Sequence, residues 1–122
     1  MNLQNIVKRF AIIANISLEE AFPWTEICEE AADEIKAHLK NNVDETEHHR
    51  RLDAAAAALG FYRYVLYRAS GGGMESFTAG EIRIKSDAKT SVKMALAVWK
   101  DAKRSIADLL TDDDFMFETI LQ

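Results

Sequence analysis

Residues 50–70 read RRLDAAAAALGFYRYVLYRAS, and this stretch decides the fold because an alanine run is combined with apolar residues at helical spacing. The apolar side chains recur every three or four positions, as on one face of a helix, at Leu52, Ala55, Ala56, Leu59, Tyr62, Leu66 and Ala69. Alanine favours the helix more than any other residue, and its small side chain lets another helix approach closely. We therefore predict a helix over residues 50–70 that packs closely against a neighbouring helix.

Gly60 and the aromatic residues after it make two further predictions about how this helix packs. A glycine inside a helix is less favourable than alanine by about 1 kcal/mol, so we expect either that a second backbone crosses there or that the helix bends. Phe61, Tyr62, Tyr64 and Tyr67 spread around the helix and cannot all face one core. Some of these rings are therefore expected to meet another surface.

Two helices are predicted before this one. Apolar residues at three- and four-residue spacing predict a first helix over residues 2–14. The sequence from Ser17 to Glu20 fits a capping box that begins a short helical turn, and Pro23 suits the first turn of the next helix. In that second helix, residues 24–39, the apolar side chains share one face and most charged side chains point elsewhere.

Residues 71–87 differ from the helical remainder of the chain. A glycine run, Gly71–Gly73, forms a flexible leash, and in the stretch SFTAGEIRIKSD (76–87) the apolar Ile82 and Ile84 alternate with charged residues, as in a strand with one apolar face. A lone strand of about five residues is not stable in water without a partner strand. We predict a short strand or hairpin around residues 76–85, paired within the chain or with another chain by strand addition.

The last part of the chain completes the expected fold class. A long fourth helix is predicted from Ala88 to about Leu110, and the tail DDDFMFETILQ (112–122) is expected to form a last short helix or to pack on a partner. The fold class is mainly α, a small bundle of four to five helices with one strand or hairpin insertion. A chain of 122 residues is expected to form a single domain, 1–122, because it suffices for one core and not for two.

Composition and charge exclude several classes of function. Hydrophobic residues make up 48% of the chain and charged residues 29%, as in an ordinary globular protein, and no apolar run approaches the roughly 20 residues that span a bilayer. The single cysteine, Cys28, cannot form an intrachain disulfide, which fits synthesis in a reducing cytoplasm. The net charge is −5, and lysine and arginine are too dispersed for a nucleic-acid footprint. We expect neither membrane association nor sequence-specific DNA binding.

Candidate catalytic and metal-binding groups are few. Glu30, Glu34 and His38 are spaced four apart, but the Glu-x-x-His spacing of di-iron bundles is absent. The sequence HHRR (48–51) could touch a phosphate, although a helix start that balances its acidic neighbours is the simpler interpretation. Cys28 has no histidine at helical spacing, and the chain contains no nucleophile elbow and no phosphate-binding loop. We therefore expect no enzymatic activity, no cofactor and no metal.

The order of these parts resembles the small head-tail connector, or head-completion, proteins of long-tailed phages and prophages. The resemblance extends over roughly residues 18–100 and is a pattern of residue classes. Its first motif is a run of small residues that ends in tyrosines, here Ala54–Ala58 with Tyr62 and Tyr64. Its second motif reads close to S-x-x-x-G-D-V-S-I, here Ser76, Gly80, Glu81, Ile82 and Ile84.

The resemblance implies an assembly role without chemistry. Connector subunits stack as a ring, commonly of about a dozen copies, beneath the portal of a filled capsid, and ring closure requires that one patch of a subunit meets a different patch of the next. The implied partners are further copies of the chain, the portal protein and a tail or stopper protein. Genome DNA would pass through without sequence-specific contacts. The implied location is the virion, at the head-tail junction, after synthesis in the bacterial cytoplasm.

The tethered segment and the aromatic helix are the material expected for subunit contacts. The candidate interface residues are Phe77, Gly80, Ile82, Ile84, Tyr62, Tyr64 and Tyr67. The chain departs from the second motif at Arg83 and Lys85, where the family more often has small polar residues. An alternative from a different class is a small cytoplasmic helical module, such as a regulator encoded by a mobile element, that binds one partner protein and forms no ring.

Overall fold

The computed structural model describes residues 1–70 and 88–111, and these residues form a helical bundle. In chain order the elements are α1 (Leu3–Ala14), α2 (Leu18–Ala21), the 3₁₀ helix η1 (Phe22–Trp24), α3 (Thr25–Ala37), α4 (His49–Ser70), α6 (Lys89–Ser105) and the 3₁₀ helix η3 (Ala107–Leu109). The mainly α fold class is thus confirmed. The strand or hairpin predicted around residues 76–85 and the tail 112–122 lie outside the described residues.

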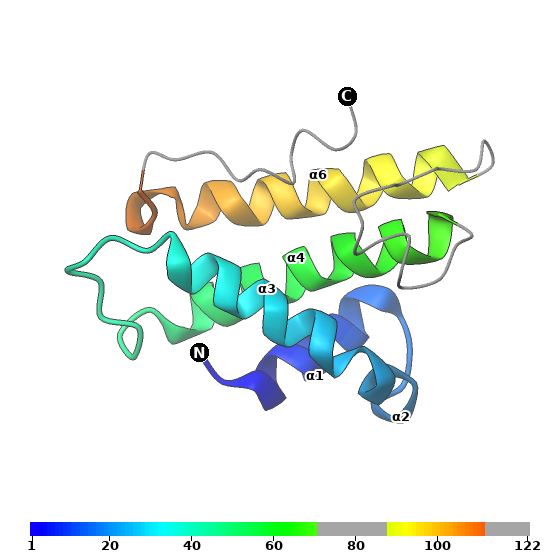
Figure 1. Ribbon diagram of the computed structural model, residues 1–122, viewed down its shortest axis with the longest axis horizontal. Helices are drawn as coiled ribbons and strands as arrows, with labels where there is room; N and C mark the ends of the chain where they lie inside the picture. The colour runs from blue at the N-terminus through cyan, green and yellow to red at the C-terminus, as the bar shows by residue number, and fades with distance from the viewer. Residues whose placement is uncertain (71–87, 112–122) are drawn as a thin grey trace.

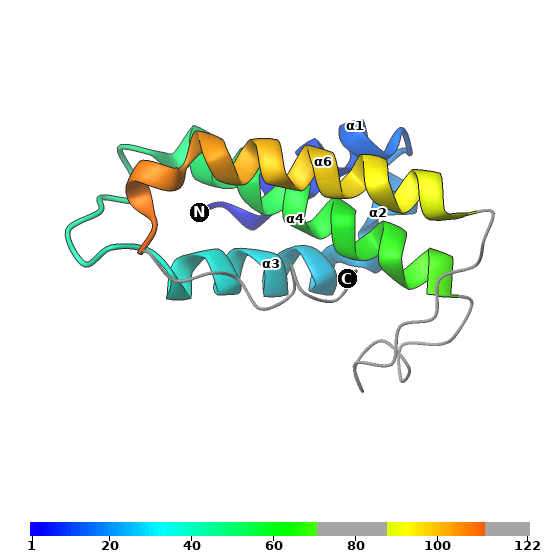
Figure 2. The same cartoon turned by 90° about the horizontal axis from the view of Figure 1, so that it is seen from above.

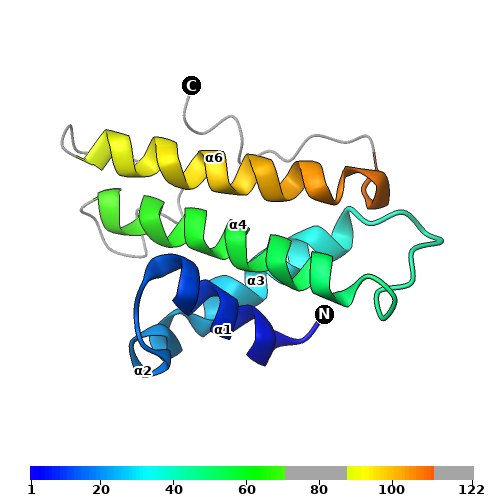
Figure 3. The same cartoon turned by 180° about the vertical axis from the view of Figure 1, so that it is seen from behind.

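The long helix α4 is the centre of the bundle. It packs against α1, α3 and α6, which surround it (Figure 1; Figure 3). Side chains on nearly every side of it are buried, including Leu52, the whole run Ala55–Gly60 and Leu66. A helix whose side chains are buried on most of its sides lies inside a bundle, with its arginines at the margins of the buried surface. The stretch predicted to pack closely against one neighbour in fact contacts three.

Gly60 is the point at which the backbone of α3 crosses α4. A Cβ atom placed on Gly60 would lie 3.3 Å from the Sγ atom of Cys28 and 3.5 Å from its Cα atom. The expectation that a second backbone crosses the helix at Gly60 is therefore confirmed. Cys28 is fully buried at this crossing, and burial raises the pKa of its thiol to about 12. The thiol is therefore a small core group and not a nucleophile at neutral pH.

The start of α1 is attached to α4 by a buried carboxylate. Asp53, in the second turn of α4, is almost fully buried and accepts a hydrogen bond of 3.0 Å from the backbone nitrogen of Asn2. Asn2 is also the N-cap of α1, because its side chain accepts a hydrogen bond from the backbone nitrogen of Asn5. A negative charge is favourable at a helix N-terminus, where backbone N–H groups are unpaired. Sequence reasoning missed this contact.

The turn between α1 and α3 agrees with its predicted capping box. The hydroxyl group of Ser17 accepts a hydrogen bond from the backbone nitrogen of Glu20, and the Glu20 carboxylate accepts one from the backbone nitrogen of Ser17, each 3.0 Å long. The bond from the Ser17 backbone lowers the pKa of Glu20. Pro23, predicted in the first turn of the next helix, lies instead in η1, and α3 begins after it at Thr25.

The ends of α3 and α6 are joined through their backbones, and this contact was not predicted. The backbone nitrogen of Lys40 donates to the carbonyl oxygen of Leu109 over 2.9 Å, and that of Thr111 donates to the oxygen of His38 over 2.8 Å. The two chain segments meet at the same end of the bundle (Figure 2). The fourth helix therefore stops at Ser105, and not near residue 110, because the residues that follow turn back to pair with the segment after α3.

Arg51 fastens the beginning of α4 to the end of α6. Its guanidinium group donates a hydrogen bond of 2.9 Å to the carbonyl oxygen of Ser105, the last residue of α6, and forms an ion pair with Asp108. A cation at this position satisfies a helix carbonyl that has no partner within the helix. HHRR (48–51) therefore has a structural role, as predicted, but Arg51 pairs with Asp108 of η3 and not with the acidic residues that precede α4.

Replacing Gly60 with valine should destabilise the chain by about 2–3 kcal/mol, because the new side chain would overlap the backbone of α3 at Cys28. The free energy of unfolding is measured by urea denaturation followed by far-ultraviolet circular dichroism. Ala97→Val, on the exposed face of α6, is the control for a β-branched residue in a helix and should cost less than about 0.7 kcal/mol. Equal losses in the two variants would show that α3 does not constrain position 60.

The ion pair of Arg51 and Asp108 should make stability depend on pH. The hydrogen bond from Arg51 lowers the folded-state pKa of Asp108 below its ordinary value of 3.8. The stabilisation is therefore present above that value and lost as the pH falls through the folded-state pKa, because the unfolded chain binds the proton more readily. Asp108→Asn should be less stable than the unmodified chain at neutral pH, and this difference should shrink below pH 3.8.

The control for this pH series is Asp101→Asn. Asp101 and Arg104 form an ion pair at 3.7 Å between two well-exposed side chains of one helix, and such pairs contribute little to stability. Unfolding is followed at each pH for the three proteins. A difference between the Asp108→Asn variant and the unmodified chain that stays constant from neutral to acidic pH would contradict the assigned role of Arg51.

Candidate interaction surfaces

Aromatic rings from three elements meet around Tyr64. The ring of Phe10 from α1 and the ring of Trp24 from η1 meet it edge to face, with centroids 5.2 and 4.7 Å away, and Phe61 is stacked on it at 6.4 Å. Trp24 also contacts Tyr67 at 5.3 Å. Pairs of this geometry contribute about 0.5–1.5 kcal/mol each beyond the burial of their surface. The cluster ties α1 and η1 to the C-terminal half of α4.

The three tyrosines predicted at subunit contacts lie in or beside this core. Tyr62 is fully buried, Tyr64 is buried, and Tyr67 is partly buried against Trp24. The other surface that the aromatic rings were expected to meet is thus supplied by α1 and η1 of the same chain. A contact with another subunit through Tyr62 or Tyr64 would require these helices to separate, so we assign both to the core.

The remaining candidate interface residues are those of the tethered segment. Phe77, Gly80, Ile82 and Ile84 lie outside the described residues, and their contacts stay a prediction. Their segment joins α4 to α6, whose adjoining ends lie at the same end of the bundle (Figure 1).

Large apolar side chains are exposed on two separate parts of the bundle. The first, which we call the corner surface, lies where α1, α2 and η1 meet and consists of Ile12, Leu18 and Phe22, which are 79%, 54% and 76% exposed. The second lies on the outer side of α6, where Met94 is 66% and Val98 39% exposed. Sequence reasoning did not single out these residues. The available signal was that Ile12, Met94 and Val98 fall off the apolar stripes of their helices.

The outer faces of α3 and α6 carry opposite charge. On α3 the exposed charged residues include Glu26, Glu29, Glu30 and Asp33. On α6 they include Lys89, Lys93, Lys100 and Arg104. The two helices lie on different sides of α4 (Figure 2), so the acidic and the basic face point away from the centre in different directions. The bundle is therefore electrically polar.

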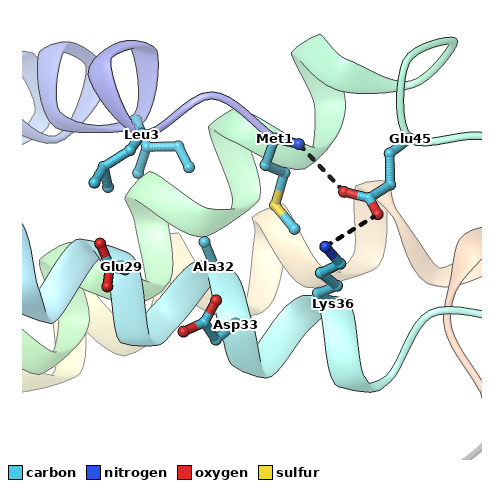
Figure 4. Close-up of a pocket in the computed structure, with 8 residues that line it drawn as sticks. Met1, Leu3, Glu29, Ala32, Asp33, Lys36 and Glu45 are labelled. Atoms are coloured by element: carbon cyan, nitrogen blue, oxygen red, sulfur yellow. Dashed lines mark hydrogen bonds and ion pairs between the residues drawn. The ribbon is translucent and has the colours of Figure 1, made fainter.

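A groove of about 270 Å³ lies between the start of α1 and α3 (Figure 4). Glu45, from the loop after α3, lies between two cations: one oxygen is 3.2 Å from the Met1 amino nitrogen and the other is 3.9 Å from Nζ of Lys36. Leu3 and Ala32 face the groove from α1 and α3. The Met1 amino group and Lys36 both contact Glu45, and the carboxylates of Glu29 and Asp33 also line the groove, which is therefore small and of mixed charge.

The described residues give no sign of metal or nucleophilic chemistry. Among residues 1–70 and 88–111, no group of three or more His, Cys, Asp or Glu side chains is placed to hold a metal ion. Of the candidate ligands, Glu34 forms an ion pair with Arg63 of α4, and Glu30 is exposed on α3. The shifted pKa values of Glu20, Cys28 and Asp108 each have a local structural cause and belong to different elements.

Two further observations concern membrane-spanning helices and similarity to known proteins. In the part of the chain that the structure describes, no helix is both long enough and apolar enough to span a membrane. No family model, curated protein or solved structure matches the chain.

Removing the Tyr64 ring should destabilise the folded chain, whereas removing the exposed Phe22 ring should not. Tyr64→Ala is expected to lose about 3–5 kcal/mol in the free energy of unfolding, because it deletes the centre of the aromatic cluster. Phe22→Ser is expected to change it by less than about 0.5 kcal/mol, because that side chain is 76% exposed. Both values come from urea denaturation, and the opposite ranking would exclude the assignment of Tyr64 to the core.

Proposed function

We propose that this chain is a non-enzymatic structural subunit of a phage or prophage virion, a head-tail connector that assembles as a ring below the portal. The ring extends the DNA channel and joins the tail or a stopper protein. The observation that carries the proposal is the pair of separate surfaces with exposed apolar side chains, the corner surface and the outer side of α6. Contiguous apolar patches on a protein surface mark sites of association, and in this proposal the exposed side chains of each surface act as such a patch.

Two surfaces favour a ring subunit over a module with one partner. A binding module needs one interaction surface. In a ring, each subunit uses one surface toward the preceding copy and a different surface toward the next copy. The corner surface lies on the α1 and α2 side of the bundle and the second surface lies on the α6 side (Figure 1), which is the separation that such an arrangement requires.

The segment between α4 and α6 adds to the proposal. These helices run antiparallel and side by side, so the end of α4 at Ser70 and the start of α6 at Lys89 lie at the same end of the bundle (Figure 1; Figure 2). In the proposed ring, the strand predicted around residues 76–85 pairs with a strand of another chain at this end. Strand addition gives affinity through backbone hydrogen bonds and suits a segment that is tethered at both of its ends.

The net charge of the chain agrees with a DNA channel. At −5, the chain is acidic, and an acidic wall repels phosphates and lets DNA pass without being held. The further partners in this proposal are the portal protein and the tail or stopper protein. The place of action is the head-tail junction of the virion.

Disrupting the gene in a strain whose unmodified prophage yields joined particles should separate heads from tails. The induced lysate is examined by electron microscopy beside the unmodified control. Free tails, together with capsids that are unjoined or have lost their DNA, are expected because the junction would lack its ring. A plasmid copy of the unmodified gene should restore joined particles.

The same preparation separates the two classes of function. Normal, infectious particles after gene disruption would rule out the connector and favour the small cytoplasmic module with one partner protein. Complementation with the Phe22→Ser variant tests the surface argument, because this substitution leaves the core intact and alters only the corner surface. Failure of this variant, together with success of the unmodified gene, is the expected result.

A further inference from the structure

We propose that copies of the chain associate through two different faces. The basic outer face of α6 of one copy packs against the acidic face of α2, η1 and α3 of a second copy. We call these two faces the basic face and the acidic face. This inference rests on the proposed function in one respect: it names the contact that would repeat around the ring.

The basic face combines a row of cations with an apolar seam. At about 100° per residue, Lys89, Lys93, Lys100 and Arg104 fall within about 60° of the helix circumference. Met94, Ala97 and Val98 run beside this row, and Met94 and Val98 are 66% and 39% exposed. The opposite side of the helix is buried against α4. Within the described residues, Lys89, Lys93 and Lys100 form no ion pair with a carboxylate.

The acidic face has the complementary composition. Its carboxylates lie within about 100° of the circumference of α3 and belong to Glu26, Glu29, Glu30 and Asp33. Leu18 and Phe22 precede them along the chain and are 54% and 76% exposed. Five acidic residues and one basic residue give α3 a net charge of −4, and five basic residues and one acidic residue give α6 a net charge of +4. The basic face also contains Asp101, which pairs with Arg104 at 3.7 Å, so each face offers an apolar seam beside charges that are mostly of one sign.

These charges decide between the ways in which two copies can meet. Two basic faces, or two acidic faces, would bring like charges together, which disfavours a two-fold symmetric contact. The basic and acidic faces attract each other, and they lie on different sides of α4 (Figure 2). When two copies meet through unlike faces, the pair still has one unoccupied basic face and one unoccupied acidic face. Association can therefore continue until a ring closes.

The apolar seam favours a protein over a nucleic acid as the occupant of the basic face. A surface that binds DNA needs cations facing phosphates, and exposed Met94 and Val98 beside them would gain nothing from a phosphate backbone. Against Leu18 and Phe22 of a second copy, the same side chains would lose their contact with water. A second copy is therefore the favoured partner, because every copy of the chain carries both the basic face and the acidic face that this contact needs.

The test is zero-length cross-linking of the full chain by carbodiimide, which joins amino and carboxylate groups only where they touch. Unlabelled and ¹⁵N-labelled protein are mixed at about 1 mM, a concentration at which even a contact with a millimolar Kd is well populated. Mass spectrometry of the mixed-isotope products distinguishes links between chains from links within one chain. We expect links between chains that join Lys93 or Lys100 to Glu26 or Glu30.

Charge reversal provides the matched variants. Lys93→Glu with Lys100→Glu reverses the basic face, and Glu26→Lys with Glu30→Lys reverses the acidic face. Each pair alone should reduce the yield of links between Lys89 of one chain and Glu29 or Asp33 of another at least tenfold, because like charges then meet. These unsubstituted positions are monitored because the substituted ones no longer pair an amino group with a carboxylate. The variant with all four substitutions should recover the yield, because the two faces are complementary again. All four positions are exposed, and far-ultraviolet circular dichroism verifies that each variant is folded.

Three results would overturn the inference. The first is the absence of links between chains at this concentration, or links that survive either reversal. The second is that the α6 lysines link within one chain to Asp112–Asp114, which would make the chain's own tail the occupant. The third is the absence of links between chains together with binding of a DNA duplex that is lost on reversal of the basic face.

The outcome is distinguishable from that of the proposed function. If the links form and recover as expected while gene disruption leaves joined particles, the contact stands and the connector role fails. If disruption separates heads from tails and the links are absent, the connector role stands and its subunit contact lies elsewhere on the chain.

Discussion

The close crossing of α3 over α4 at Gly60 is the constraint on which the rest of the structure depends. A Cβ atom on Gly60 would lie 3.3 Å from the Sγ atom of Cys28, so even a methyl group there would require a small shift of that side chain. The alanines before Gly60 keep the side chains on the rest of that surface short. Because α4 is narrow there, three helices can reach it from different sides and share one hydrophobic core. Larger side chains on this face of α4 would move α3 outward and loosen the packing of the core between the two helices.

Polar contacts at the ends of the helices then fix how the bundle is oriented. Asp53 holds the start of α1, Arg51 holds the end of α6, and two backbone hydrogen bonds join the segments that follow α3 and η3. These contacts are directional, whereas apolar packing alone would permit small rotations of each helix. Their consequence for function is indirect. By setting the rotation of α3 and α6, they determine that the acidic and basic faces point outward on different sides.

This arrangement separates the apolar residues that form the core of the chain from those that the proposed contact between copies would use. The aromatic cluster around Tyr64 is used within the chain, where it joins α1 and η1 to α4. Phe22, Met94 and Val98 remain outside, next to charges that are mostly of one sign on each face. A subunit with two unlike and complementary surfaces is suited to a closed ring, in which every copy repeats the same contact.

The sequence by itself determined the helices, the capping box at Ser17 and Glu20, and two alternatives for Gly60, a crossing backbone or a bend, of which the structure has the crossing. These features depend on neighbours within four residues or on the size of one side chain, so spacing and propensity are sufficient to predict them. Only the tertiary structure decided that Tyr62 and Tyr64 face the core and that Arg51 pairs with Asp108, because both depend on which distant helix lies opposite. The physical reason is that periodicity gives the direction of a side chain around its own helix, whereas its burial depends on how many other helices pack around that helix and at what rotation.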